Sequence, residues 1–137
     1  MSDAIQKIFS KIIAFILAVI TSLMGTTTDV PELRIKENVT TSTDIVSVEV
    51  INYTGEEVTT GNYFIVEKKD GEQWVKLDFK DDYAVTDMAY IIKNRSTAVF
   101  KFSFVNAFGK PLDAGEYRIG KSFGEKVSYA TFTVTQA

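Results

Sequence analysis

Four aspartates lie close together and are the residues whose chemistry would suit a metal ion: Asp78, Asp81, Asp82 and Asp87. Calcium prefers several oxygen ligands from a flexible loop, so these carboxylates are candidate ligands. They lack the fixed spacing and the turn glycine of a known calcium loop. We therefore predict a solvated acidic loop here and no metal site.

The 137 residues include no histidine and no cysteine. The commonest general base and the commonest zinc ligand are therefore missing, and no disulfide, thiolate metal site or lipidated cysteine can form. No arrangement of Asp, Glu, Lys, Ser and Tyr stands out as catalytic. We predict a protein without catalytic residues, cofactor or small-molecule substrate.

The charge balance bears on nucleic-acid partners. The formal net charge is -3, from 15 basic and 18 acidic residues. Such a chain lacks the excess of positive charge that attracts a polyanion, so nucleic-acid binding is excluded. The length fits one domain of common size plus an appendage.

Three triplets satisfy the N-glycosylation sequon, at Asn38, Asn52 and Asn94. In a bacterial protein such triplets in a threonine-rich chain arise mostly by chance. In an archaeal or eukaryotic surface protein, glycans would be expected on loops. The sequence leaves glycosylation at these three residues open.

The first 25 residues contain a long apolar segment that must position everything after it. Ser2 suits a helix N-cap, and Gly25 suits a helix end. We predict a hydrophobic helix over residues 1–25, a linker over 26–32 and a soluble domain over 33–137. Apolar residues follow the i, i+3, i+4, i+7 spacing of a helix with one apolar face: Ile5, Ile8, Phe9, Ile12, Ile13, Phe15, Ile16, Val19, Ile20 and Leu23.

A cleaved signal peptide is one interpretation of this helix, because Lys7 and Lys11 precede an apolar run of suitable length. The end of the run argues against it. Residues 21–26 contain no small-x-small pair for cleavage, and Asp3 is unusual in the basic region of a signal peptide.

A retained membrane anchor is the second interpretation. A helix over residues 4–25 would be about 33 Å long, close to the ~30 Å of a hydrocarbon core. Lys7 and Lys11 would then have to snorkel to the inner membrane surface. Their charge would hold the N-terminus inside and place the soluble domain outside.

Assembly is the third interpretation. Ala14, Ala18 and Ser22 are small residues at four-residue spacing, which allows helices to pack closely on copies of themselves. Residues 3–24 are therefore expected to contact either a membrane or copies of the same chain. In a filament, such helices would form the core and the soluble domains would lie outside.

After Pro31 the apolar period changes from that of a helix to two, which is typical of strands. Val46, Val48 and Val50 share one face, as do Phe100, Phe102 and Phe104. Strands are predicted over residues 33–36, 45–52, 62–69, 73–79, 89–92, 98–104, 116–120 and 127–134. We predict a mainly β protein, an immunoglobulin-like antiparallel β-sandwich preceded by one N-terminal hydrophobic α-helix.

Three local features refine this prediction. Asp70 and Gly71 fall between two predicted strands and favour a hairpin with a type I′ turn. Trp74 is the only tryptophan and is expected to cap or fill the core. Tyr117, at the start of a late strand, resembles the tyrosine that pins a corner of many immunoglobulin-like sandwiches.

Five segments within about residues 44–121 follow one another in a specific order and spacing: 52–55, 61–68, 71–77, 90–93 and 108–119. In these segments the soluble part resembles the bacterial immunoglobulin-like domains of surface and secreted proteins. The resemblance implies an extracellular structural or binding module without an enzymatic site, and it does not extend to the N-terminal helix.

These features predict a non-enzymatic protein of the cell envelope, with the sandwich held outside the cell by a retained helix and a structural or adhesive role. The alternative is a pilus-like filament subunit that assembles through its helices. A secreted inhibitor or ligand-binding module is a third possibility and requires signal-peptide cleavage. In each case an edge strand offers a protein partner a place for strand addition, although the open edge is not evident from the sequence.

Overall fold

The computed structural model describes residues 28–137. The predicted N-terminal helix, with its apolar face, Lys7 and Lys11, lies outside the described residues, and its three interpretations stay predictions. Within residues 28–137, no helix has the length and apolar character needed to cross a membrane.

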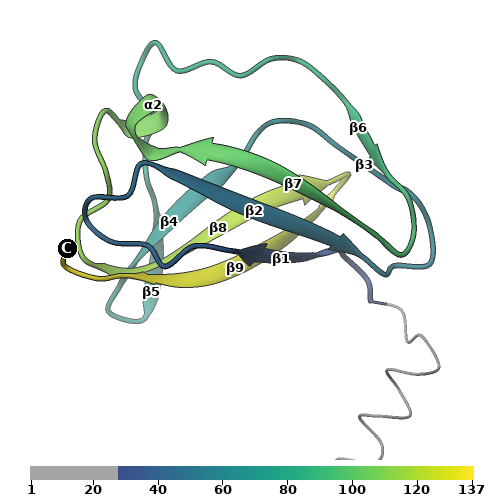
Figure 1. Cartoon of the computed structure of the whole chain (residues 1–137), viewed down its shortest axis with the longest axis horizontal. Coiled ribbons are helices and arrows are strands. Elements are labelled where there is room, and N and C mark those ends of the chain that lie inside the picture. Colours follow the sequence, from purple (N-terminus) through teal and green to yellow (C-terminus); the bar gives the residue numbers. More distant parts are fainter. Residues whose placement is uncertain (1–27) are drawn as a thin grey trace, which may run out of the picture.

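Two antiparallel sheets face each other across one core (Figure 1). One sheet has the strand order β1-β2-β7 and the other β5-β4-β8-β9, while β3 and β6 form a separate pair. The predicted mainly β antiparallel sandwich is confirmed for this part of the chain. The strands are β1 (Glu32–Ile35), β2 (Ile45–Asn52), β3 (Val58–Thr60), β4 (Ile65–Asp70), β5 (Gln73–Lys76), β6 (Tyr90–Ile92), β7 (Ser96–Ser103), β8 (Gly115–Phe123) and β9 (Lys126–Val134).

The core consists of residues that alternate along the strands, as the period-two pattern predicts. Val46, Val48 and Val50 of β2 are fully buried. The register places Val46 opposite Phe102 and Val48 opposite Phe100 on β7, so both strands turn the same set of side chains inward. The facing sheet contributes Val66, Tyr117, Ile119, Ala130 and Val134.

Tyr117 fixes the corner that leads into β8. Its side chain is buried, its ring stacks on Phe132 at 5.6 Å, and its hydroxyl donates a hydrogen bond to the Asp113 carbonyl at 2.8 Å. Burial raises the pKa of the Tyr117 phenol, so the group stays protonated as a donor. The arrangement matches the corner tyrosine that the sequence suggests.

Tyr117→Phe is expected to lower the free energy of unfolding by about 1 kcal/mol, because the Asp113 carbonyl loses its donor while the ring packing stays. Urea unfolding at pH 7 measures the change. Tyr129→Phe is the matched control, since Tyr129 is exposed and its hydroxyl forms no hydrogen bond within residues 28–137. Equal losses in the two variants would contradict the role of the Tyr117 hydroxyl.

The hairpin between β4 and β5 is confirmed, but the predicted turn type is wrong. Asp70 pairs with Gln73, so the two central residues are Gly71 and Glu72. Gly71 has φ of 62°, whereas Glu72 has no positive φ. A type I′ turn needs positive φ at both positions, so the turn has the type II′ pattern with glycine first.

Trp74 neither caps nor fills the core, contrary to the prediction. It is half-buried on the outer face of the β5-β4-β8-β9 sheet, where the Arg118 guanidinium lies 4.8 Å from its ring centre and 4.0 Å from that of Tyr129. Arg118 also forms an ion pair with Glu67. Because the guanidinium is held by two rings and a carboxylate, this group stiffens the outer face of the sheet.

A short helix, α2 (Phe104–Phe108), begins at the last residue of the strand predicted over residues 98–104. Ser103 accepts a hydrogen bond from the Asn106 amide as N-cap, and Gly109 ends the helix with φ of 88°. Phe104 and Ala107 are buried by this turn of helix. The strand β3 and the helix α2 are therefore absent from the sequence-based prediction, since both are too short to show a period.

Candidate functional site

The free edge of β7 is the starting point of the candidate site. β7 pairs with β2 along its whole length, and no other strand in residues 28–137 pairs with its second edge. In an antiparallel pair, backbone groups of alternate residues point to the partner and those between point away. The free edge thus carries every second peptide group of β7.

The phase of this alternation follows from the hydrogen bonds at the end of the sheet. The Phe104 amide donates to the Asp44 carbonyl at 2.9 Å, which continues the register of β2 and β7. Residues 98, 100 and 102 therefore bond to β2. The backbone groups of Val99, Lys101 and Ser103 point to the open side.

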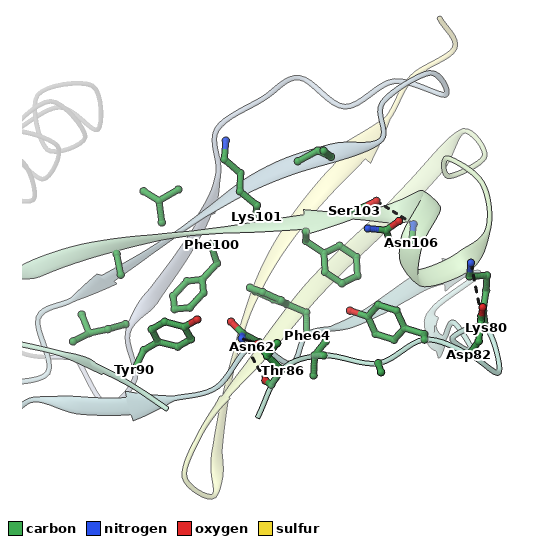
Figure 2. A pocket seen from close by; sticks show the side chains of 18 of the residues that line it. Asn62, Phe64, Lys80, Asp82, Thr86, Tyr90, Phe100, Lys101, Ser103 and Asn106 are labelled. Carbon is green, nitrogen blue, oxygen red and sulfur yellow. Dashed lines mark hydrogen bonds and ion pairs between the residues drawn. The ribbon is translucent and has the colours of Figure 1, made fainter. Parts of the chain in front are cut away.

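A groove of about 810 Å³ runs along this edge (Figure 2). Its walls are β7 on one side and the segment 82–86 with β6 on the other. β6 pairs with β3, not with β7, so the groove lies where a further strand could join the sheet. Aromatic side chains lie between the walls, among them Phe64, Tyr90 and Phe100 (Figure 2).

The lining of the groove is rich in apolar side chains. Four of the ten large apolar residues that are exposed in the described part of the chain line it: Ile45, Val85, Ile91 and Val99. Burial of such side chains stabilises a complex in proportion to the area removed from water. The groove is therefore suited to a partner with apolar side chains of its own.

Two charged groups of the groove differ in how they are compensated. Lys80 forms an ion pair with Asp82 at 3.8 Å. Lys101 is exposed and donates to the Ser47 hydroxyl at 2.8 Å, but no carboxylate of residues 28–137 lies within ion-pair distance of it. The Glu37 carboxylate accepts from the Ser47 amide and acts on Lys101 from a greater distance. Lys101 is therefore the less compensated of the two lysines that line the groove.

A buried lysine lies behind the aromatic residues of the groove. Lys121 is 1% exposed, and its Nζ donates to the carbonyls of Gly61 at 2.5 Å and Tyr63 at 3.4 Å. The same Nζ lies 3.9 Å from the Phe64 ring centre and 4.3 Å from that of Phe100. Burial lowers the pKa of Lys121 to about 8. Lys121 thereby fixes the position of both rings.

Two sets of contacts hold the segment opposite β7. The Asn62 amide group donates to the Thr86 hydroxyl at 2.5 Å and to the Thr86 carbonyl at 3.3 Å (Figure 2). Phe79 stacks on Tyr83 at 4.6 Å and on Phe108 at 5.5 Å, which secures the start of the same segment. The second wall of the groove is therefore anchored at both ends.

The aspartates considered as calcium ligands do not form a cluster. Asp78, Asp81, Asp82 and Asp87 are all exposed, and within residues 28–137 no group of three acidic residues could hold a metal ion. The role of this stretch lies in the groove wall that residues 82–86 form opposite β7, not in its carboxylates.

The three sequons differ in access. Asn38 and Asn94 are exposed, whereas Asn52 is fully buried. The Asn52 Nδ2 donates to the carbonyls of Glu56 at 2.8 Å and Ile92 at 2.9 Å. Because both hydrogens are used inside the fold, glycosylation of Asn52 in the folded domain is excluded.

The groove is absent from the sequence-based prediction, although strand addition at some edge is part of it. The one sequence feature that could indicate the groove is the irregular stretch of residues 80–87 between two strand patterns. Only the pairing of β6 with β3 shows that this stretch leaves β7 uncovered.

A comparison with protein-family models matches residues 32–136 to the family described as bacterial Ig-like domain. No curated protein matches the chain in a sequence search. Domains of this family are often extracellular or surface-exposed and are typically non-enzymatic. Because the match spans more than half of the sequence, the chain belongs to the bacterial Ig-like domain family.

Proposed function

We propose that this protein is a non-enzymatic component of the cell envelope whose Ig-like domain is displayed outside the cell and binds other proteins. The observation that supports the proposal most is the family match over residues 32–136, directly after an apolar segment in residues 3–24. Family membership indicates a surface or structural role. The groove along β7 supports a binding role.

The proposed display depends on retention of the N-terminal segment. Lys7 and Lys11 lie before the longest apolar run, and residues 21–26 lack a small-x-small cleavage pair. In this arrangement the segment spans the membrane and the domain that follows is extracellular. The membrane is then the first partner of the protein, through residues 3–24.

Protease treatment of intact cells tests this proposal. We expect the domain to be degraded from outside, and the untreated protein to be found in the envelope fraction with an intact mass that includes residues 1–25. Deletion of residues 1–25 is the control and is expected to abolish envelope retention. Mature protein in the culture medium that begins near residue 26 would overturn the proposal.

A second candidate function is a filament subunit, which the spacing of Ala14, Ala18 and Ser22 favours. Sizing of detergent-free native material separates it from a single anchored chain. A large particle that collapses when residues 1–25 are deleted supports the filament. A monomer with the N-terminal segment intact rules it out.

A further inference from the structure

We propose that the groove along β7 binds one extended segment of a partner protein by strand addition, and that this segment has an acidic residue between two large apolar residues. The inference deepens the proposed binding role and relies on the proposed display for where the partner is met. Binding itself can be tested on purified protein.

The backbone supplies the first part of the recognition. The peptide groups of Val99, Lys101 and Ser103 face the groove, and no other strand of residues 28–137 pairs with them. A strand that lies beside β7 would exchange hydrogen bonds with all three residues. These bonds require an extended partner but no particular sequence.

Side chains that point inward supply the second part. Successive residues of the added strand point to opposite faces of the sheet, so the residues opposite Phe100 and Phe102 turn toward the core side. There they meet an aromatic cluster in which Phe64 lies 5.5 Å from Phe102, and Tyr90 lies 5.3 Å from Phe100. These two partner positions therefore favour large apolar residues.

The position between them faces outward, beside Lys101. Cross-strand neighbours on one face of a sheet are close enough to form an ion pair, and like charges there are destabilising. Lys101 forms no direct ion pair in the described residues, and only the more distant Glu37 carboxylate acts on it. Lys80, in contrast, is paired with Asp82. An Asp or Glu at the central partner position would complement Lys101.

A second copy of the chain fits the groove less well. The antiparallel register that uses all three outward residues of β7 would place Lys101 opposite Lys101, and lysine on a strand edge opposes such pairing. The segment 82–86 also forms a second wall, so the groove offers room for a single strand beside β7.

The N-terminal segment of the same chain also lacks the required pattern. As a strand, residues 12–20 would place Ile12, Ile16 and Ile20 on one face and Phe15 with Val19 on the other, so both faces would be apolar. The only acid before residue 28 is Asp3, which lies between Ser2 and Ala4. The partner segment is therefore expected in another protein.

Amide NMR titration of the full chain in detergent micelles tests the inference with a nine-residue probe peptide, in which Val-Glu-Val is flanked by threonines. We expect the largest shift changes at the amides of Val99, Lys101 and Ser103. A control peptide with Val-Lys-Val at its centre is expected to bind about tenfold more weakly. Lys101→Glu is expected to reverse this preference.

Val99→Pro is the matched backbone variant. Proline removes an outward amide that β2 does not use, so the fold is retained while probe binding falls about tenfold or more. If this variant does not fold, the Lys101→Glu variant is used to test the inference instead.

Three results would overturn the inference: no binding of the probe, equal binding of both peptides by the wild type and by Lys101→Glu, or shift changes centred on β5 or β9. Dimerisation of the free chain through β7 would also overturn it. Failure of surface display on cells would leave these measurements unchanged, so the two proposals fail separately.

Discussion

Replacement of Asn52 by alanine is expected to lower the free energy of unfolding by about 3 kcal/mol at pH 7. Asn52 is fully buried and connects three parts of the domain. Its Nδ2 donates to the carbonyls of Glu56 and Ile92, and its Oδ1 accepts from the Thr54 amide at 3.1 Å and hydroxyl at 2.8 Å. Alanine would remove all four bonds, and only the Thr54 hydroxyl and the Glu56 carbonyl would keep a bond, to each other.

Urea unfolding gives the size of the loss, and Asn94→Ala is the matched control. Asn94 also belongs to a sequon and accepts a hydrogen bond from the Gly55 amide at 2.9 Å, but it is exposed. Water can replace its bond, so a loss of less than about 1 kcal/mol is expected. A similar small loss for Asn52→Ala would contradict the connecting role of Asn52.

The stability of the wild-type domain is expected to rise by about 2 kcal/mol between pH 7 and pH 9.5 through Lys121 alone. The folded-state pKa of Lys121 is about 8, below its ordinary value of 10.5. Between these pH values the unfolded chain binds more protons than the folded chain. Stability therefore increases with pH, because the folded chain releases the Lys121 proton at a lower pH than the unfolded chain does. The free-energy cost of burying the charge is removed with that proton.

Lys121→Met is the variant that isolates this effect. The difference in unfolding free energy between wild type and variant, measured in urea at pH 7, 8, 9 and 9.5, is expected to shift by about 2 kcal/mol in favour of the wild type. Burial raises the pKa values of Tyr83 and Tyr117 above 10, and their opposite contribution begins near that pH. A difference that does not change with pH would contradict a buried ammonium without a carboxylate partner at Lys121.

The elements with a strong period could be predicted from sequence. In β2 and β7, valine or phenylalanine recurs at every second residue, and the structure buries those positions. Tyr117 could be placed at its corner because the hydroxyl bond spans only four residues. Local spacing is sufficient for such features.

The candidate site depends on contacts between residues distant in sequence. Whether β7 has a free edge is decided by the pairing of β3 with β6, two strands of three residues each. The sequence around Lys121 does not distinguish it from other residues of a strand. Its buried ammonium is hydrogen-bonded to carbonyls some sixty residues away, which the sequence does not reveal. Trp74 lies outside the core because the short β5 pairs at the edge of its sheet, where Arg118 provides a stack.

The family match identifies the fold but does not indicate which partner this member of the family binds. In this chain the features that could bind a partner are an apolar N-terminal segment and a groove in the folded domain. We propose separate roles for them: residues 3–24 retain the protein at the membrane, and the groove holds a second protein.

Amide hydrogen exchange of the free protein tests the open edge of β7 most directly. We predict an alternating pattern, in which the amides of Val99, Lys101 and Ser103 exchange quickly while those of Phe100 and Phe102 are protected by β2. Uniform protection along β7 would show that its outer edge is already occupied and would contradict the account.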